Sequence, residues 1–212
     1  MSKDTKSSFV RHLPCPKCGS SDANSLYDDN HTYCFSCETT GQYDEEITIE
    51  TKSKPVASSS TRKFKALTKR KISKDTCQFY EYSQGMYGGN PAHFAQYHTA
   101  DGEPAGVKVR LPDKRFVWLG TQPGTFYAQH KYNAGKMLVV TEGEIDALSY
   151  AETHKCRWPT VSIPNGAQGA TSVFKRNLEW LAGFQKVILM FDQDAPGRKA
   201  AEECAILLPP GK

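Results

Sequence analysis

Residues 136–146 read KMLVVTEGEID, an apolar run that changes abruptly into a cluster of acids. The apolar run 137–140, which ends in two β-branched valines, has the composition of a buried strand, and the residues that follow have the spacing of a helix over about 144–153. One face of that helix would carry Ile145, Leu148 and Ala151. Glu142 is therefore predicted to lie at the C-terminal tip of a buried strand, at its turn into a helix.

The same arrangement recurs further along the chain. The run KVILMF at 186–191 is followed by Asp192-Gln193-Asp194, and Pro196 and Gly197 then open another helix. Neighbouring strands lie about 4.8 Å apart, so carboxylates at adjacent parallel tips can share metal ions. Asp192 and Asp194, two residues apart, are expected to point to the same side. We therefore predict that Glu142, Asp192 and Asp194 bind catalytic Mg²⁺ or Mn²⁺ for phosphoryl transfer.

Acids at these positions also have a simpler explanation. Helix N-termini favour carboxylates through the helix dipole alone, and for Glu144 and Asp146 the two explanations are equally open.

Strands and helices alternate through the C-terminal part of the chain. After 136–140 the pattern predicts a helix at 144–153, a strand at 160–163, a helix at 171–181, a strand at 186–191 and a helix at 198–208. This order predicts a parallel sheet with helices packed on it. Pro164-Asn165-Gly166, after the middle strand, could approach a phosphate with its backbone or could simply form a turn.

The composition is that of a protein with one sizeable core and a small additional module. The 212 residues are 38% hydrophobic, and they include no run of membrane-spanning length. The N-terminal residues lack the apolar segment of a secretory signal, so we expect a cytoplasmic location, in the host cell if the protein is viral, with no membrane partner. In that reducing compartment the seven cysteines are not expected to form disulfides.

Positive charge is concentrated in the middle of the chain. Residues 51–136 carry fifteen Lys or Arg against five Asp or Glu, whereas residues 1–50 carry four against nine. A basic segment next to an acidic metal site suits an enzyme that acts on nucleic acid, although a solvated basic face would give the same count.

Four cysteines near the N-terminus form two C-x-x-C pairs separated by fifteen residues: Cys15, Cys18, Cys34 and Cys37. This spacing is typical of a zinc ribbon in which four thiolates hold one structural Zn²⁺. Unrelated thiols or a redox pair are the weaker alternatives, because a redox motif has a single C-x-x-C.

Between the two cysteine pairs, residues 24–33 predict two short strands joined by a turn at 28–30. Such a hairpin would expose Tyr27, Asp29, His31 and Tyr33 on a ribbon, where aromatic and polar side chains can stack on and read bases. The two tyrosines could equally pack on the zinc core. The expected zinc-binding domain covers 10–50, and the polar, Ser-rich run 51–61 predicts a flexible linker.

Residues 62–135 are expected to form a basic subdomain that precedes the catalytic one at 136–212. Ser73 is predicted to cap a short helix ending near Phe79, and strands are predicted at 93–98, 107–111 and 115–119. Alternation along these strands and the next turn gives a basic stripe suited to nucleotide or template phosphates, formed by Lys108, Arg110, Lys114 and Arg115. No role follows from the pattern for the histidines at 12, 93, 98, 130 and 154, or for Cys77, Cys156 and Cys204.

A strand ending in Glu-Gly and a later strand ending in Asp-x-Asp resemble the toprim fold of bacterial-type primases, topoisomerases and some nucleases. With the four-cysteine ribbon before them, TEGEID and ILMFDQDAPGRKA resemble the primase half of the primase-helicases of short-tailed coliphages, from about Leu13 onward. The fold class expected is thus a zinc ribbon, a linker, a small antiparallel β subdomain and a toprim-type α/β subdomain.

The resemblance implies a DNA primase, a DNA-directed RNA polymerase that makes short RNA primers on single-stranded DNA during replication. The implied substrates are ribonucleoside triphosphates, with ATP and CTP foremost, and the implied partners are a replicative helicase domain and a phage DNA polymerase. Matched by position, the four cysteines hold zinc, Asp29 and His31 read template bases, Lys108 and Lys114 contact nucleotide or template, and Glu142, Asp192 and Asp194 hold magnesium.

The chain also departs from the family pattern. Asn30 stands where the family turn has glycine, and Pro164-Asn165-Gly166 replaces a Gly-His-Gly-like loop. The family has another strand and a further aspartate after the last predicted helix, so we expect 136–212 to be a truncated catalytic subdomain, and no P-loop is present. The rival hypotheses are a non-catalytic zinc/toprim DNA-binding protein of the recombination-repair mediator type, which carries a helix-hairpin-helix segment, and a toprim nuclease. A topoisomerase would need a tyrosine nucleophile on another domain.

Overall fold

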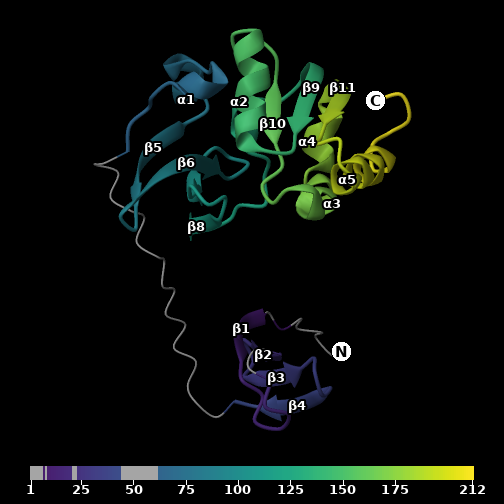
Figure 1. Cartoon of the computed structure of the whole chain (residues 1–212). Coiled ribbons are helices and arrows are strands. Elements are labelled where there is room, and N and C mark those ends of the chain that lie inside the picture. The colour runs from purple at the N-terminus through teal and green to yellow at the C-terminus, as the bar shows by residue number, and fades with distance from the viewer. Residues whose placement is uncertain (1–6, 8, 21–22, 44–61) are drawn as a thin grey trace. The chain divides into compact units, whose positions relative to one another are not determined.

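A computed structural model describes residues 7, 9–20, 23–43 and 62–212. The chain divides into two compact units, Met1–Thr51 and Lys52–Lys212, each taken by itself below (Figure 1). The predicted linker, 51–61, lies outside the described residues. The finer domain boundaries predicted at 62–135 and 136–212 stay predictions.

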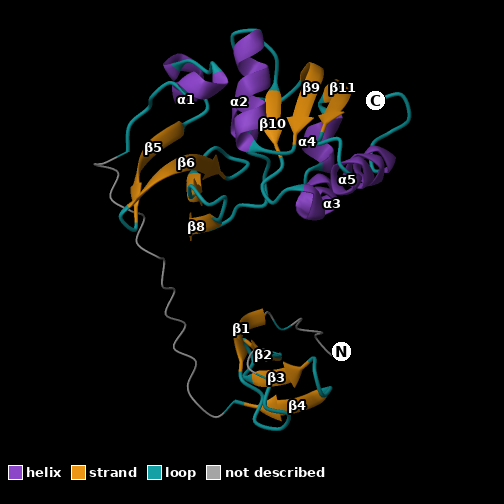
Figure 2. Cartoon of the chain, in the orientation of Figure 1, coloured by secondary structure: helices purple, strands orange, loops and turns teal. Residues whose placement is uncertain are grey.

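The described part of the first unit is an antiparallel sheet. Its strands are β1 (Phe9–Leu13), β2 (Asn24–Tyr27), β3 (His31–Cys34) and β4 (Thr39–Gln42), and they pair in that order. The predicted hairpin is confirmed as β2 and β3, and Asn30 occupies its turn with a φ of 66°, which asparagine tolerates better than most residues. Figure 2 shows strands and loops through this part of the chain.

The second unit begins with a short 3-10 turn, helix α1 and a four-stranded antiparallel sheet. The turn is η2 (Thr68–Arg70) and the helix is α1 (Lys74–Phe79), which Ser73 caps by accepting a hydrogen bond from the backbone N–H of Thr76, as predicted. The strands, in sheet order, are β5 (Tyr82–Tyr87), β6 (Asn90–His98), β7 (Pro104–Arg110) and β8 (Phe116–Gly120). Strand β5 was not predicted, although Gly88 and Gly89, both at positive φ, form the tight turn that joins it to β6.

The predicted parallel sheet with helices is confirmed. Its strands are β9 (Gly135–Thr141), β10 (Thr160–Ser162) and β11 (Phe184–Met190), with β9 between the other two. The segments that accompany them are η3 (Gln129–Lys131), α2 (Glu144–Thr153), η4 (Ala167–Gly169), α3 (Ala170–Arg176), α4 (Leu178–Ala182) and α5 (Ala195–Ile206). Because β9 is central, the residue that follows it faces the tips of both neighbours.

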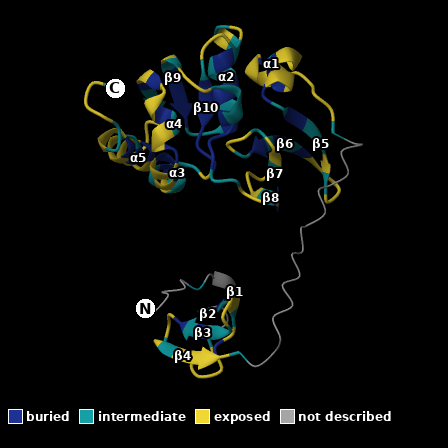
Figure 3. Ribbon diagram, turned by 180° about the vertical axis from the view of Figure 1, so that it is seen from behind, coloured by how far each residue is buried: buried dark blue, intermediate teal, exposed yellow. Residues whose placement is uncertain are grey.

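Two apolar clusters surround this sheet and helix α2. Leu138 and Val140 of β9 pack with Phe174 and Leu181 of the helices that follow β10. Leu148, on α2, packs instead in a second cluster that includes tyrosines of the antiparallel subdomain, namely Tyr80, Tyr82, Tyr97 and Tyr127. Helix α2 thus lies between the antiparallel sheet and the parallel sheet (Figure 1). Strands β9 and β10 are largely buried (Figure 3). Packing on α2 fixes the antiparallel strands relative to the tips of the parallel ones.

One predicted helix is in fact two. The helix expected over 171–181 is interrupted at Asn177, whose backbone leaves the helical region with a φ of −119°. Its buried side chain donates hydrogen bonds to the carbonyl oxygens of Val173 and Gly124 and accepts one from the amide of Gln129. Asparagine competes with the helix for backbone groups, and here its side chain ties the break to the loop before β9.

None of the helices in the described ranges is long and apolar enough to cross a membrane.

Candidate functional site

A pocket of about 540 Å³ lies at the C-terminal edge of the parallel sheet, where the strand tips meet the antiparallel subdomain. It is lined by acidic residues from the parallel part (Glu142, Glu144, Asp146, Asp192), by basic residues from the antiparallel part (Arg70, Lys108, Arg110), by the loop Pro164–Gly166, and by Gly143, Ile145, Phe116 and Trp118. Ligands bind in such open sheets outside the carboxyl ends of the strands, which is where this pocket is found.

Glu142 connects the tips of all three parallel strands. It follows β9, and its two carboxylate oxygens accept backbone hydrogen bonds from Ala167, after β10, at 3.3 Å and from Asp192, after β11, at 3.2 Å. A Cβ added to Gly166 would lie 3.7 Å from the same carboxylate. The predicted position of Glu142 at the convergence of strand tips is therefore confirmed, while its role as a metal ligand stays a prediction.

Asp192 and Asp194 do not act alike. Asp192 lines the pocket, but the carboxylate of Asp194 caps α5, accepting a hydrogen bond from the backbone N–H of Gly197 at 2.8 Å. Glycine is needed at 197, because a Cβ there would lie 2.1 Å from the carbonyl oxygen of Asp192. In this structure the helix cap engages one carboxylate oxygen of Asp194, and the expectation that both aspartates hold the metal ion stays a prediction.

Asp146 takes the place beside Asp192. Burial raises the pKa of the Asp146 carboxyl, and the nearby charge of Asp192 raises it further. Gly143 provides the room, since a Cβ on that residue would lie 2.7 Å from an oxygen of Asp146. Carboxylates held close together repel each other until a cation binds, and Glu142, Asp146 and Asp192 all line this pocket. Among the described residues, neither Glu142 with Asp192 and Asp194 nor Glu142 with Asp146 and Asp192 gathers its carboxylate oxygens within 4.8 Å of one another.

Glu144 and Lys108 form a buried ion pair at the edge of this pocket. The Lys108 ammonium lies 2.8 Å from Glu144 Oε1, and each side chain is 9% exposed. The same ammonium donates to the carbonyl oxygen of Pro164 at 2.6 Å, and the hydroxyl of Tyr97 donates to Glu144 at 2.6 Å. The pair therefore joins β7, α2 and the loop after β10, and it orients that loop towards Glu142.

The predicted basic stripe is divided by the structure. Lys108 is buried in the ion pair, whereas Arg110 lines the pocket beside Arg70, which sequence reasoning did not single out. Lys114 and Arg115 are exposed in the turn between β7 and β8, outside the pocket lining, and Arg115 pairs with Asp113. The basic run around Arg70 was visible in the sequence, but which of its members reaches the site depends on η2.

The four predicted zinc cysteines converge in the first unit. Their sulfur atoms all lie within 4.8 Å of one another, with Cys15 and Cys37 at 3.8 Å and Cys18 and Cys34 at 3.7 Å. A tetrahedron with bonds of about 2.3 Å has edges of about 3.8 Å, so the spacing fits a zinc ion. Backbone N–H groups of Cys18 and Lys17 lower the pKa of the Cys15 thiol to about 6, which favours the metal-binding thiolate.

The hairpin side chains predicted to read bases lie together at the β2–β3 turn. The rings of Tyr27 and His31 are stacked, with centroids 4.2 Å apart, and His31 Nδ1 lies 2.5 Å from a carboxylate oxygen of Asp29. Tyr33 instead contacts Phe35 edge to face. The structure thus presents a flat ring and an adjacent carboxylate at one end of the ribbon.

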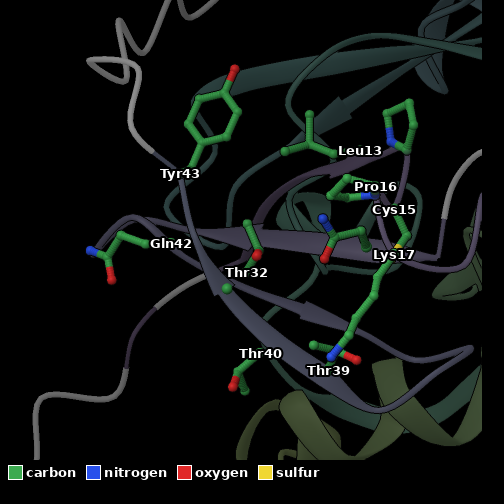
Figure 4. A pocket seen from close by; sticks show the side chains of 12 residues that line it. Leu13, Cys15, Pro16, Lys17, Thr32, Thr39, Thr40, Gln42 and Tyr43 are labelled. Atoms are coloured by element: carbon green, nitrogen blue, oxygen red, sulfur yellow. The ribbon is translucent and has the colours of Figure 1, made fainter.

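Another pocket, of about 650 Å³, lies in the first unit, and residues other than Tyr27, Asp29 and His31 line it. Figure 4 shows Leu13, Thr32, Gln42 and Tyr43 among the side chains around it. Because side chains alternate along a strand, Thr32 faces this hollow while its neighbour His31 does not. The predicted base-reading residues therefore lie outside this pocket.

Comparisons with known proteins agree with this architecture. Residues 62–120 match the family described as "Bacteriophage T7 DNA helicase/primase, N-terminal a+b fold", and residues 139–211 match the Toprim-like family. The DNA helicase/primase of Enterobacteria phage T3 is 38% identical over 226 aligned residues, which cover all of this chain and 40% of the relative. The chain thus spans about two fifths of that relative's length.

Two solved structures also match at high identity. The primase fragment of the bacteriophage T7 primase-helicase is 40% identical, with a TM-score of 0.68, covering 97% of this chain and 88% of that one. Primase domains of bacteriophage T7 in a structure with the lagging-strand DNA polymerase and an RNA/DNA hybrid are 41% identical, with a TM-score of 0.68 and coverage of 71% and 78%. The chain therefore belongs to the phage DNA helicase/primase family, and these residues correspond to the family's primase part.

Proposed function

We propose that this chain is a DNA primase that joins ribonucleotides into short primers on a single-stranded DNA template. One observation supports this most directly: the carboxylates of Glu142, Asp146 and Asp192 face Arg70 and Arg110 across one pocket. A triphosphate needs both kinds of group, because its own charge must be neutralised while its α-phosphorus is attacked.

The residues of the pocket have distinct proposed roles. Arg70 and Arg110 bind phosphates, and Lys108 positions Glu144 and the loop at Pro164 without contacting substrate directly. Mg²⁺, bound by Glu142 and Asp192 with Asp146 as the added ligand, would neutralise phosphate charge and favour ionisation of the attacking 3′ hydroxyl. The carboxylate of Glu142 is held at this edge by the backbone N–H groups of Ala167 and Asp192, so its position is prearranged.

The cysteine cluster is proposed to hold one structural zinc ion, and the hairpin to read the template. The stacked pair Tyr27–His31 offers a ring face for a base, and Asp29 offers a hydrogen-bond acceptor. A closed four-sulfur site leaves no open coordination position, so its role would be to support this ribbon.

The proposed partners follow from the relatives. The T3 relative is a helicase/primase, and the T7 primase domains were captured with a DNA polymerase and an RNA/DNA hybrid. We therefore expect a helicase segment and a phage DNA polymerase as partners, and a primer–template hybrid as the product.

The test measures ribonucleotide incorporation on single-stranded templates with Mg²⁺ by the unaltered chain, by Asp192→Asn and by Glu202→Gln. The first substitution removes a proposed ligand without changing the side chain's shape, and the second removes an exposed carboxylate of α5 outside the pocket. We expect products from the unaltered chain and from Glu202→Gln, and a loss of at least 100-fold, on the order of 2.7 kcal/mol in barrier, from Asp192→Asn.

Stability provides an independent measurement. In buffer without divalent ions, Asp192→Asn should unfold at the same or a slightly higher denaturant concentration, because it relieves repulsion with Asp146. Retained synthesis by Asp192→Asn would contradict the site, and template binding without any ribonucleotide incorporation by the unaltered chain would indicate a DNA-binding protein instead.

A further inference from the structure

Three residues distant in the sequence place metal-binding atoms together outside the pocket lining. Glu81 lies between α1 and β5, His98 ends β6 and His130 lies in η3. The candidate ligand atoms of all three lie within 4.8 Å of one another. None of the three lines the pocket described above, and no sequence pattern connects them.

The distances within this cluster fit one small divalent ion. His98 Nε2 lies 3.3 Å from Glu81 Oε2, and His130 Nε2 lies 3.7 Å from Glu81 Oε1. Bonds of about 2.0–2.1 Å in a tetrahedron give edges of about 3.3–3.4 Å between ligand atoms. Only small side-chain shifts would bring the three groups into a coordination sphere.

The cluster is also built into the fold. The side chains of His98 and His130 are 7% and 15% exposed, while that of Glu81 is 33% exposed and leaves a path for an ion. The carbonyl oxygen of His98 accepts a hydrogen bond from Thr125 at 2.7 Å, and the carbonyl oxygen of Glu81 accepts one from the backbone N–H of Gln96. The backbone at two of the three positions is thereby held by contacts independent of any ion.

We propose that Glu81, His98 and His130 form a second zinc site, separate from the cysteine cluster. Two imidazole nitrogens and a carboxylate oxygen are a donor set that favours Zn²⁺ over Mg²⁺ or Ca²⁺. Three protein ligands leave the fourth position to water. The ion would connect the α1–β5 junction, the end of β6 and η3. From η3 the chain continues into β9.

Lys131 carries a positive charge that would compete with a metal ion for this position. Its ammonium lies 3.1 Å from Glu81 Oε1, so in the absence of metal the four residues form an ion-pair cluster. A metal site and a simple ion-pair cluster respond oppositely to removal of that ammonium. Without Lys131 a metal site gains affinity, whereas an ion-pair cluster only loses stability.

The test is metal stoichiometry of the full chain, measured after dialysis against buffered free zinc. We expect two zinc ions per chain for the unaltered protein, and one for His98→Gln and for His130→Gln. His154→Gln is the matched control, because that histidine lies outside both clusters, and it should retain two. Bound Co²⁺ should show the same split, with the second equivalent lacking the sulfur-to-metal charge-transfer band of the cysteine cluster.

Lys131→Met tests the site by an expected gain of zinc affinity, whereas the histidine variants test it by a loss of bound zinc. It should bind the second zinc at least threefold more tightly than the unaltered chain. One zinc per chain in the unaltered protein, two in His98→Gln, or lower stability with unchanged or weaker zinc affinity in Lys131→Met would each overturn the proposal.

Discussion

Carboxylates that look equivalent in the sequence have different tasks in the structure. Glu142 accepts backbone hydrogen bonds from residues after both neighbouring strands, Asp192 faces the pocket, Asp194 caps a helix and Glu144 pairs with a buried lysine. Spacing along the chain identified the strand tips but not these assignments, because each depends on a partner from another element. The pair Lys108–Glu144, for example, spans 36 positions.

The buried pair leads to a prediction for a single residue. Replacing Lys108 with Met should lower the free energy of unfolding by about 3–5 kcal/mol, because Glu144 would keep a buried charge without its partner. Lys114→Met, in the exposed turn, should change it by less than about 0.5 kcal/mol. Denaturant unfolding without divalent ions would measure both.

The same pair can be tested by coupling. Adding Glu144→Gln to Lys108→Met should recover part of the lost stability, because no unpaired charge is then buried. If the double variant is as unstable as the sum of the single changes, the two side chains do not act as a pair.

At the scale of elements, residue periodicity predicted what depends on local sequence. Helix α2 begins at Glu144 and ends at Thr153 as expected, because its apolar face is regular and its start follows a strand. Strand β5 was missed because its buried and exposed residues do not alternate. The break at Asn177 was missed because two of the partners that hold its side chain, Gly124 and Gln129, lie far along the chain. Local pattern predicts elements well where one face is buried, and poorly where long-range contacts decide.

The β2–β3 hairpin leads to a prediction about an element. Exchanging residues 27–33 for the corresponding hairpin of another phage relative should change which template is primed, because Tyr27, Asp29 and His31 present the proposed reading surface there. Synthesis of dinucleotides without a template should stay within about twofold, since the pocket at the parallel sheet is untouched. Primer sequencing on mixed templates measures the preference, and an unchanged preference would remove the hairpin from template reading.

At the scale of the whole molecule, the two units differ in what stabilises them. The second has extended apolar clusters, whereas the described part of the first buries few apolar side chains, with Leu26 and Cys34 at its centre. Small modules that bury so little apolar surface are commonly stabilised by a metal or by disulfides. The cysteine spacing alone predicted that the first unit depends on a metal. The residues that line the pocket could be identified only from the folded second unit.

Because the two units are stabilised in different ways, we expect them to unfold independently. Cys34→Ser should abolish the sulfur-bound zinc and unfold the first unit, because structural zinc contributes about 10–16 kcal/mol of apparent binding free energy in small modules. The melting transition of the second unit should stay within about 2 °C of its usual temperature, since its clusters contain none of the four cysteines.

Cys204→Ser, at a fully buried position on α5, is the reciprocal control. It should retain the sulfur-bound zinc and lower the stability of the second unit by about 1–3 kcal/mol, because a hydroxyl replaces a thiol in an apolar cluster. Calorimetry combined with zinc analysis measures both effects, and a single transition shifted equally by the two substitutions would show that the units unfold together.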